Sequence, residues 1–326
     1  SYLACPEDSL SFRKAKENNL NPIKIYGRDV LSAAANFLKI RKICKDVKPD
    51  VIIVHTGSLH FITFIWSALH RIPVIRTRII DQKAGKSFLN KFLYEHTGKL
   101  ITPTEKSRKE LISVFAINED KVKTLYFPAN MDDSTVNALP EKKVVGMIGR
   151  LDPVKGHATF LEAAARVQSK FNDVEFHIAG REENIKWQTL EELCGQLSLK
   201  NVFYHGFLSK DEIKSFIKNC SVGVVASYGS EVVSRATVEW MSAGRPVVAT
   251  SVGCIPEILD SGVGGYIVNS NDPQIMAEKI ILLIENPQII EQMGKKNLEK
   301  SKTILSKENF AGSWLKILEE VKAGLK

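Results

Sequence analysis

Two glutamates, Glu231 and Glu239, stand with seven residues between them in a segment whose flanks predict a regular local structure. We expect Glu231 on a strand-to-helix turn and Glu239 inside the helix, which Gly244 ends before an apolar strand over 246–250. The first amides of a helix have no intrahelical acceptor, so residues 233–236 can offer theirs to phosphate oxygens. Two carboxylates that can accept sugar hydroxyls, with free amides between them, favour a sugar nucleotide as the ligand.

The spacing of this pair is weak evidence by itself, because the chain has 37 acidic residues. In the alternative interpretation, Glu231 is an ordinary acidic residue near the start of a helix, and Glu239 is an ordinary charged residue on a helix surface. The flanks favour the functional interpretation. Glu239 stands between Val238 and Trp240 on a helix with few surface residues, where a buried carboxylate needs hydrogen-bond partners.

A second candidate segment runs from Gly149 to His157, after a predicted strand that ends at Ile148. Gly149 permits a tight turn, and Gly156 permits close approach of the backbone. Arg150 and Lys155 place two cations beside a helix N-terminus, which is itself an anion site. The segment predicts a diphosphate site, and the alternative is a basic loop with solvated side chains.

The first part of the chain offers three further candidates. His55 ends the predicted strand over 51–54, where a side chain can face a ligand. Arg76 and Arg78 have the same parity in the next strand, so we expect them on one side. Two cations at a strand end predict an anionic ligand, and salt bridges are the alternative.

Charge and composition limit the partners. The chain has 326 residues and a net charge of +8, and residues 1–140 carry 22 Lys and Arg against 14 Asp and Glu. The rest is neutral, so the first part is expected to meet an anionic acceptor or a membrane surface, unless it is a solvated basic face. The most apolar run, 59–69, is too short to span a bilayer. Five scattered cysteines are typical of free thiols in a reducing compartment. Nucleic acid is not expected, because no basic patch is interleaved with aromatic residues.

Short apolar runs alternate with helical patterns along most of the chain, which predicts an α/β fold of two doubly wound, Rossmann-like domains with parallel sheets. The turn-rich segment 127–142 is the expected linker. The expected domains cover residues 1–137 and 138–306. A doubly wound domain normally opens with a strand and a Gly-rich turn, and the first domain is expected to lack both. The predicted strands are 22–25, 51–54, 73–77, 100–102, 123–125, 143–148, 175–179, 202–204, 222–225, 246–250 and 266–268.

The chain resembles the retaining glycosyltransferases of family 4, also called glycosyltransferase group 1, which have the GT-B fold. The resemblance over 144–270 is specific, and in the first half it is limited to His55 and the segment 75–78, similar to an Arg-Thr-Arg-His segment. The residues that carry it in the second half are Gly149-Arg150-Leu151, Lys155-Gly156, Ala179-Gly180, His205-Gly206-Phe207, Glu231, Glu239, Met241-x-Ala243-Gly244-x-Pro246-Val247-Val248-Ala249 and Gly253-x-x-Pro256-Glu257.

The resemblance implies sugar transfer from a nucleotide-diphosphate sugar with retention at the anomeric carbon and without a metal or other cofactor. It implies that Arg150 and Lys155 neutralise the diphosphate, that Glu231 contacts the sugar and that Glu239 contacts the ribose. The final helix, about 307–326, is expected to cross back to the first domain. The remaining implied donor residues are Gly149, Gly180, Gly206 and Phe207 near the phosphates and base, and Val233, Ser234 and Arg235 as amide donors.

Its implied setting is cell-envelope glycolipid or polysaccharide synthesis, such as lipopolysaccharide, with an anionic or lipid-linked acceptor. The expected location is the cytoplasm, either free or peripheral on the inner face of the membrane. One departure is that Ile79 and Ile80 follow Arg78 where a subset of the family has His. The alternative function is therefore a catalytically inactive protein that binds nucleotide sugars or acts as a scaffold.

Overall fold

The computed structural model describes residues 1–26, 30–78, 87–128 and 138–324. Two compact units are distinguished by their internal contacts. The first contains residues 1–102, 107–124 and 314–326, and the second contains 103–106 and 125–313. Ile79, Ile80, most of the predicted linker and the predicted boundary at residue 137 lie outside the described residues.

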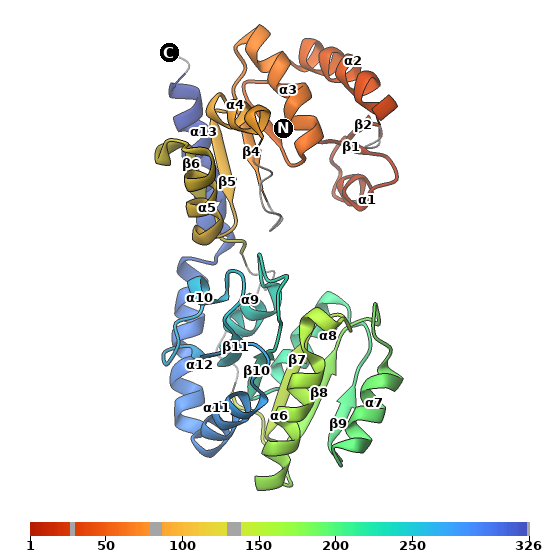
Figure 1. Cartoon of the computed structure of the whole chain (residues 1–326), viewed down its shortest axis with the longest axis vertical. Helices are drawn as coiled ribbons and strands as arrows, with labels where there is room; N and C mark the ends of the chain where they lie inside the picture. Colours follow the sequence, from red (N-terminus) through yellow and green to blue (C-terminus); the bar gives the residue numbers. More distant parts are fainter. Residues whose placement is uncertain (27–29, 79–86, 129–137, 325–326) are drawn as a thin grey trace. The chain divides into compact units, whose positions relative to one another are not determined.

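The second unit is built on a six-stranded, fully parallel sheet with the strand order β12-β11-β10-β7-β8-β9 (Figure 1). From β7 the chain adds strands on one side and then returns to add β10, β11 and β12 on the other. This is the doubly wound order, in which β7 and β10 are neighbours at the point where the winding reverses. The strands are β7 (Val144–Ile148), β8 (Glu175–Ala179), β9 (Val202–Tyr204), β10 (Val222–Val225), β11 (Val247–Thr250) and β12 (Gly265–Val268).

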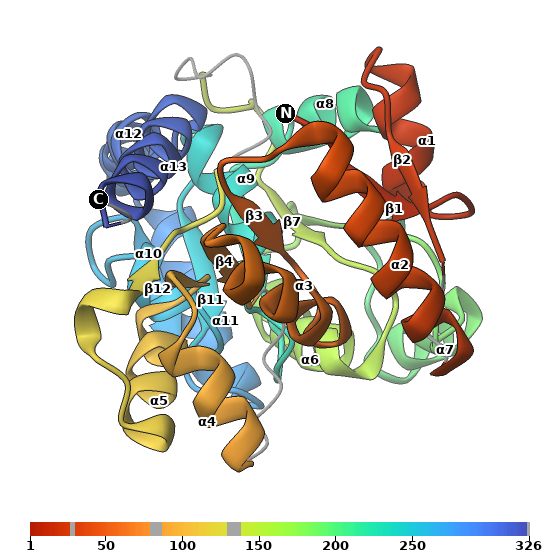
Figure 2. The same cartoon turned by 90° about the horizontal axis from the view of Figure 1, so that it is seen from above.

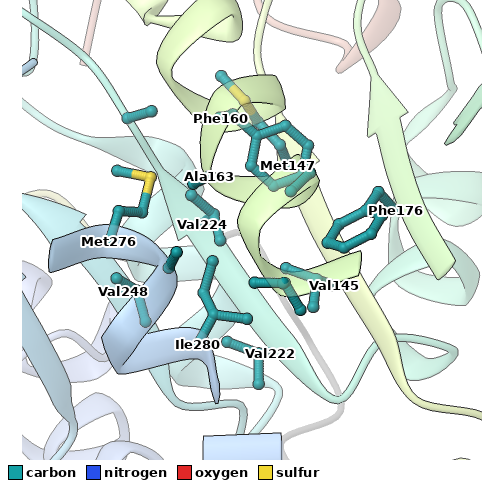
Figure 3. Packing of buried hydrophobic residues seen from close by; sticks show 14 of the residues in the cluster. Val145, Met147, Phe160, Ala163, Phe176, Val222, Val224, Val248, Met276 and Ile280 are labelled. Carbon is teal, nitrogen blue, oxygen red and sulfur yellow. The ribbon is translucent and has the colours of Figure 1, made fainter. Parts of the chain in front are cut away.

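Helices cover both faces of this sheet because successive strand residues point to opposite sides. Val145 and Met147 of β7 face one core, shown in Figure 3 with Phe160, Met276 and their neighbours from α6 and α11. Val144 belongs to the other core, formed with α8, α9 and α10. The helices of this unit are α6 (His157–Lys170), α7 (Trp187–Gln196), α8 (Lys210–Lys218), α9 (Arg235–Ser242), α10 (Ile255–Ile258), α11 (Pro273–Glu285) and α12 (Pro287–Thr303), with the short 3-10 helix η2 (Pro153–Lys155). The last helix, α13 (Lys307–Ala323), begins in this unit and belongs to the first unit from residue 314 on.

The first unit has a four-stranded parallel sheet, β3-β4-β5-β6, and a separate parallel pair, β1-β2. Helices α2 and α3 lie side by side in Figure 2. The strands are β1 (Ala4–Pro6), β2 (Ile23–Ile25), β3 (Ile52–Val54), β4 (Val74–Thr77), β5 (Lys99–Thr102) and β6 (Val122–Thr124). The helices are α1 (Leu10–Glu17), α2 (Val30–Val47), α3 (Gly57–His70), α4 (Phe88–Glu95) and α5 (Glu105–Phe115), with the 3-10 helix η1 (Glu119–Lys121).

The predicted α/β class is confirmed, and all eleven predicted strands are present within one residue at either end. The expected lack of an opening strand is wrong, because the short strand β1 precedes α1 and pairs with β2. The turn at 7–9 between β1 and α1 contains no glycine. Among the described residues, no helix has both the length and the apolar character that a membrane crossing requires.

Two glycines hold the loops at the carboxyl edge of the six-stranded sheet against one another. Gly156 has φ +73°, and a Cβ there would lie 2.0 Å from the carbonyl oxygen of Ala226. Gly253 has φ +57°, and its Cβ would lie 2.0 Å from the carbonyl oxygen of Glu231. The amide of Cys254 donates to that same carbonyl at 2.9 Å. The backbone around Glu231 is therefore fixed by a contact that only glycine permits.

We predict that Gly253→Ala displaces Glu231 and destabilises the fold by more than the ~1–2 kcal/mol expected for a left-handed alanine alone. Gly262→Ala is the matched control, since Gly262 has φ +83° but no atom within 4 Å of its added Cβ. Urea unfolding of both variants measures the difference. Equal losses of stability would show that the approach of Gly253 to Glu231 does not constrain the loop.

A buried histidine links the stability of the second unit to pH. His157 is the first residue of α6 and is 1% exposed. Burial lowers the pKa of His157 to about 4, so its ring is neutral at pH 7. In the unfolded chain the ring takes up a proton near pH 6.5, which favours unfolding as the pH falls from about 6.5 to about 4.

We predict that His157→Leu removes this contribution. Over that pH range the wild type should lose up to about 3 kcal/mol of unfolding free energy more than the variant, the equivalent of the lowered pKa. Urea titrations at pH 4 to 7 measure both curves. Parallel pH dependences would contradict a neutral, buried His157.

Candidate functional site

The candidate site of the second unit lies where β7 and β10 end side by side. In open parallel sheets, ligands bind at the carboxyl ends of the strands where the winding reverses. Residues 149–156 follow β7, and residues 226–234 follow β10. The amide of Tyr228 donates to the carbonyl of Val154 at 2.8 Å, which joins the two loops. The predicted diphosphate loop and the predicted Glu231 turn are therefore neighbours.

Lys155 and Glu231 form a partly buried ion pair between these loops. Lys155 Nζ lies 2.5 Å from Glu231 Oε1, and Ser227 Oγ donates to the same oxygen at 2.7 Å. The Glu231 residue is 5% exposed. Two residues predicted to act on different parts of one ligand are thus in direct contact in the protein itself.

Arg150 also pairs with acids of its own unit. Its guanidinium lies 3.4 Å from Asp152 and 3.2 Å from Glu183. Asp152 caps η2 by accepting from the amide of Val154 at 3.0 Å. That hydrogen bond is the main reason why the pKa of Asp152 is lowered, and Arg150 and Lys155 both add to the effect. Asp152 is therefore paired with Arg150, and the charge of Lys155 adds to its electrostatic surroundings.

The turn before α9 has an unusual backbone. Ser230 and Ser234 have φ values of +61° and +38°, a left-handed conformation that non-glycine residues adopt only when their surroundings hold them there. Ser234 is the N-cap of α9, but its hydroxyl contacts Thr237 Oγ1 at 2.8 Å and caps no amide. Since this side chain caps none of them, the first-turn amides of α9 stay candidates for binding an anion. Val233 is half-buried and Arg235 is exposed.

Glu239 lies within α9 and is half-buried. Burial raises its pKa, and the charge of Arg235 partly opposes the rise. None of the described residues makes a hydrogen bond or ion pair with its carboxylate. A half-buried acid of this kind gains from a ligand that donates hydroxyl groups.

The other predicted donor residues follow the ends of neighbouring strands. Gly149 follows β7, and its carbonyl oxygen lies 1.9 Å from where a Cβ of Gly180 would be, so Gly180 must lack a side chain. The amide of Gly180 donates to the carbonyl of Gly206 at 2.8 Å. Phe207 is 75% exposed beside it. An exposed aromatic ring at a sheet edge is suited to stacking on a nucleobase.

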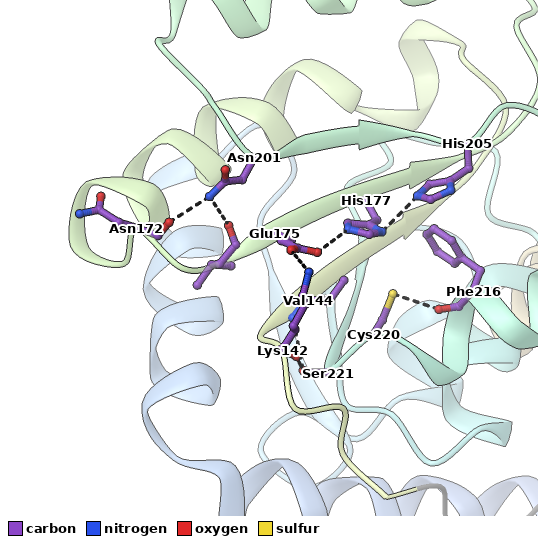
Figure 4. A network of polar contacts seen from close by, with 11 residues as sticks. Lys142, Val144, Asn172, Glu175, His177, Asn201, His205, Phe216, Cys220 and Ser221 are labelled. Atoms are coloured by element: carbon purple, nitrogen blue, oxygen red, sulfur yellow. Dashed lines mark hydrogen bonds and ion pairs between the residues drawn. The ribbon is translucent and has the colours of Figure 1, made fainter.

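A chain of polar contacts on β8 and β9 supports this edge (Figure 4). His177 Nε2 lies 3.2 Å from Glu175, and His205 Nε2 lies 3.1 Å from His177 Nδ1. Lys142 pairs with Glu175 at 2.7 Å. Burial lowers the pKa of both histidines, so both are neutral at pH 7. The contacts connect His205, the residue before Gly206, with His177 and Glu175 of β8.

His55, Arg76 and Arg78 form a separate cluster in the first unit. His55 Nδ1 lies 2.6 Å from Thr77 Oγ1, and burial with the charge of Arg76 lowers its pKa. Arg76 is buried at 9% exposure and donates to the carbonyl of Val54 at 3.2 Å. Arg78 donates to the hydroxyl of Tyr94 at 3.2 Å. The three predicted residues therefore lie at one edge of the sheet.

The sequence analysis included Gly253 and Glu257 in its motifs but predicted no role for either residue. Gly253 positions Glu231, as described above. Glu257 accepts hydrogen bonds from the amides of Glu105 and Lys106 at 2.6 and 2.9 Å and from the hydroxyl of Tyr126 at 2.9 Å, so its function is structural. Within the described ranges, no group of three or more potential ligands could hold a metal ion.

Comparisons with known proteins fit this geometry. Residues 132–300 match the family described as glycosyl transferases group 1, and residues 2–132 match glycosyltransferase family 4. An uncharacterized glycosyltransferase of Methanocaldococcus jannaschii is 29% identical over 71% of the chain and 65% of its own length. A Staphylococcus aureus poly(ribitol-phosphate) alpha-N-acetylglucosaminyltransferase is 26% identical over 70% of the chain and 45% of its own length. The chain thus spans about half to two thirds of these relatives.

Solved structures share the fold. A glycosyltransferase from Rickettsia africae has a TM-score of 0.85 at 15% identity, covering 98% of this chain and 89% of that one. Anabaena HepE in complex with UDP has a TM-score of 0.83 at 19% identity, covering 98% and 91%. These likenesses confirm the predicted GT-B fold class with two Rossmann-like domains. With a family match over more than half of its residues, the chain belongs to the group 1 glycosyl transferases.

Proposed function

We propose that the protein transfers a sugar from a nucleotide-diphosphate sugar to an acceptor. The observation that carries this proposal is the Lys155–Glu231 pair at the junction of β7 and β10, next to the open amides of α9. A diphosphate at those amides would attract Lys155 and Arg150, while Glu231 and Glu239 would accept hydroxyls of the sugar and the ribose. Phe207 would stack on the base.

We infer retention of the anomeric configuration and no metal cofactor. When the leaving diphosphate departs, negative charge builds up on its oxygens, and cations and amides already held in place stabilise it. The acceptor can then attack from the side of the leaving group, with a phosphate oxygen taking its proton. The support for this course is that the site combines cations and amides with carboxylates that can hold the sugar.

We propose an anionic or lipid-linked acceptor in cell-envelope glycolipid or polysaccharide synthesis. Two observations support this acceptor. The first part of the chain is basic, and the chain is similar to the Staphylococcus aureus poly(ribitol-phosphate) alpha-N-acetylglucosaminyltransferase. The corresponding location is cytoplasmic, with peripheral contact at a membrane surface when the acceptor is lipid-linked.

Removal of Lys155 should weaken nucleotide diphosphate binding. We expect Lys155→Ala to cost about 1.5–3 kcal/mol, the scale of a charge-assisted hydrogen bond. Calorimetric titration with a panel of nucleoside diphosphates measures this. Lys170→Ala is the control, because Lys170 is an exposed cation at the other end of α6. If no nucleotide binds the wild type, or both variants bind equally, Lys155 is not part of a donor site.

The stereochemistry of transfer is a separate test. We expect the product to have the same anomeric configuration as the donor, because attack and departure occur on one face of the sugar. The anomeric proton coupling in the NMR spectrum of the product reports it. An inverted product would exclude the retaining course, and donor binding without turnover on any acceptor would favour the inactive alternative.

A further inference from the structure

Arg76 is a buried cation that no described residue pairs with an opposite charge. It is 9% exposed, and within the described ranges its Nε–H has no hydrogen-bond acceptor. None of the described carboxylates forms an ion pair with it. Buried arginines are nearly always paired, because removing a charge from water costs several kcal/mol unless an opposite charge compensates it.

The neighbouring groups Val54 and His60 are neutral, so neither compensates the charge of Arg76. Its Nη1 donates to the carbonyl of Val54 at 3.2 Å, and Tyr94 lies near enough to affect its titration. Burial and, to a smaller extent, the charge of Arg76 lower the pKa of His60 to about 4, so this buried ring is also neutral. Burial lowers the pKa of Arg76 itself only to about 10, which leaves the guanidinium charged at pH 7.

A second guanidinium stands beside it. Arg78 directly follows β4 and donates to Tyr94 at 3.2 Å, and its charge contributes to the lowered pKa of Arg76. The fold thus holds two like charges close together at the carboxyl edge of a parallel sheet, which is the edge where such sheets bind ligands. The exposed His55 lies at the same edge and adds a hydrogen-bonding ring.

We propose that Arg76, together with Arg78 and His55, binds a phosphate group of the acceptor. A phosphate carries close to two negative charges and several acceptor oxygens, so it can satisfy two guanidinium groups at once, whereas a carboxylate carries one charge. The statement that this phosphate belongs to the acceptor rests on the proposed function. The anion site itself rests on Arg76.

The Nε–H signal of Arg76 provides a direct test in the full chain. In an arginine-labelled ¹⁵N NMR spectrum, this signal should shift saturably as inorganic phosphate is added. Arg76→Gln assigns the signal. Arg78→Gln should weaken the phosphate response at least about tenfold, the effect of losing one charge-assisted hydrogen bond. Arg71→Gln is the control, since Arg71 is an exposed arginine before β4 at the opposite end of the strand.

Two further arms identify the source of the phosphate and separate this site from the donor site. A soluble sugar phosphate and vesicles that contain a prenyl diphosphate are titrated in parallel, and a response to either supports the proposal. Lys155→Ala should weaken nucleotide binding at least about tenfold and leave the Arg76 response unchanged. An Arg76 signal that responds to none of the three phosphates overturns the inference, even where nucleotide binding is normal. Circular dichroism confirms that each variant is folded.

Discussion

The second unit depends on one electrostatic constraint, the partly buried contact between Lys155 and Glu231. A lysine and a glutamate taken out of water must remain paired, because either charge left alone in this position would be strongly destabilising. The pair therefore joins the loop after β7 to the loop after β10, and it does so where the winding of the sheet reverses. Gly156 and Gly253 support it by letting the backbones approach closely.

The same constraint prepares the site for charge. Arg150 and Lys155 are both held near Asp152, and the turn before α9 is kept in a strained left-handed form at Ser230 and Ser234. These groups are already ordered, so a ligand meets cations and amides that need little rearrangement. An incoming diphosphate would compete with Glu231 and Asp152 for the two cations, so the strength of the internal pairs limits the affinity for the donor.

Much of the fold could be predicted from sequence because its signals are local. Short runs of three to six residues marked the strands within one residue, and Gly244 marked the end of α9 correctly, with φ +67° just after the helix. The predicted positions of Glu231 on a turn and Glu239 in a helix were correct for the same reason. The partners of Glu239 were not predictable, and none of the described side chains supplies one.

The sequence by itself determined the α/β class, the places of the strands and the loops that carry the candidate residues, since these follow from the periodicity of neighbouring residues. Only the tertiary structure decided which charges meet. Lys155 and Glu231 are 76 residues apart in the chain, and Arg150 could as well have been solvated as paired with Asp152 and Glu183. The burial of Arg76, with no acid paired to it among the described residues, was equally unpredictable from the sequence. Contacts between distant residues depend on how the strands are ordered and how closely their loops pack, and no local pattern records either.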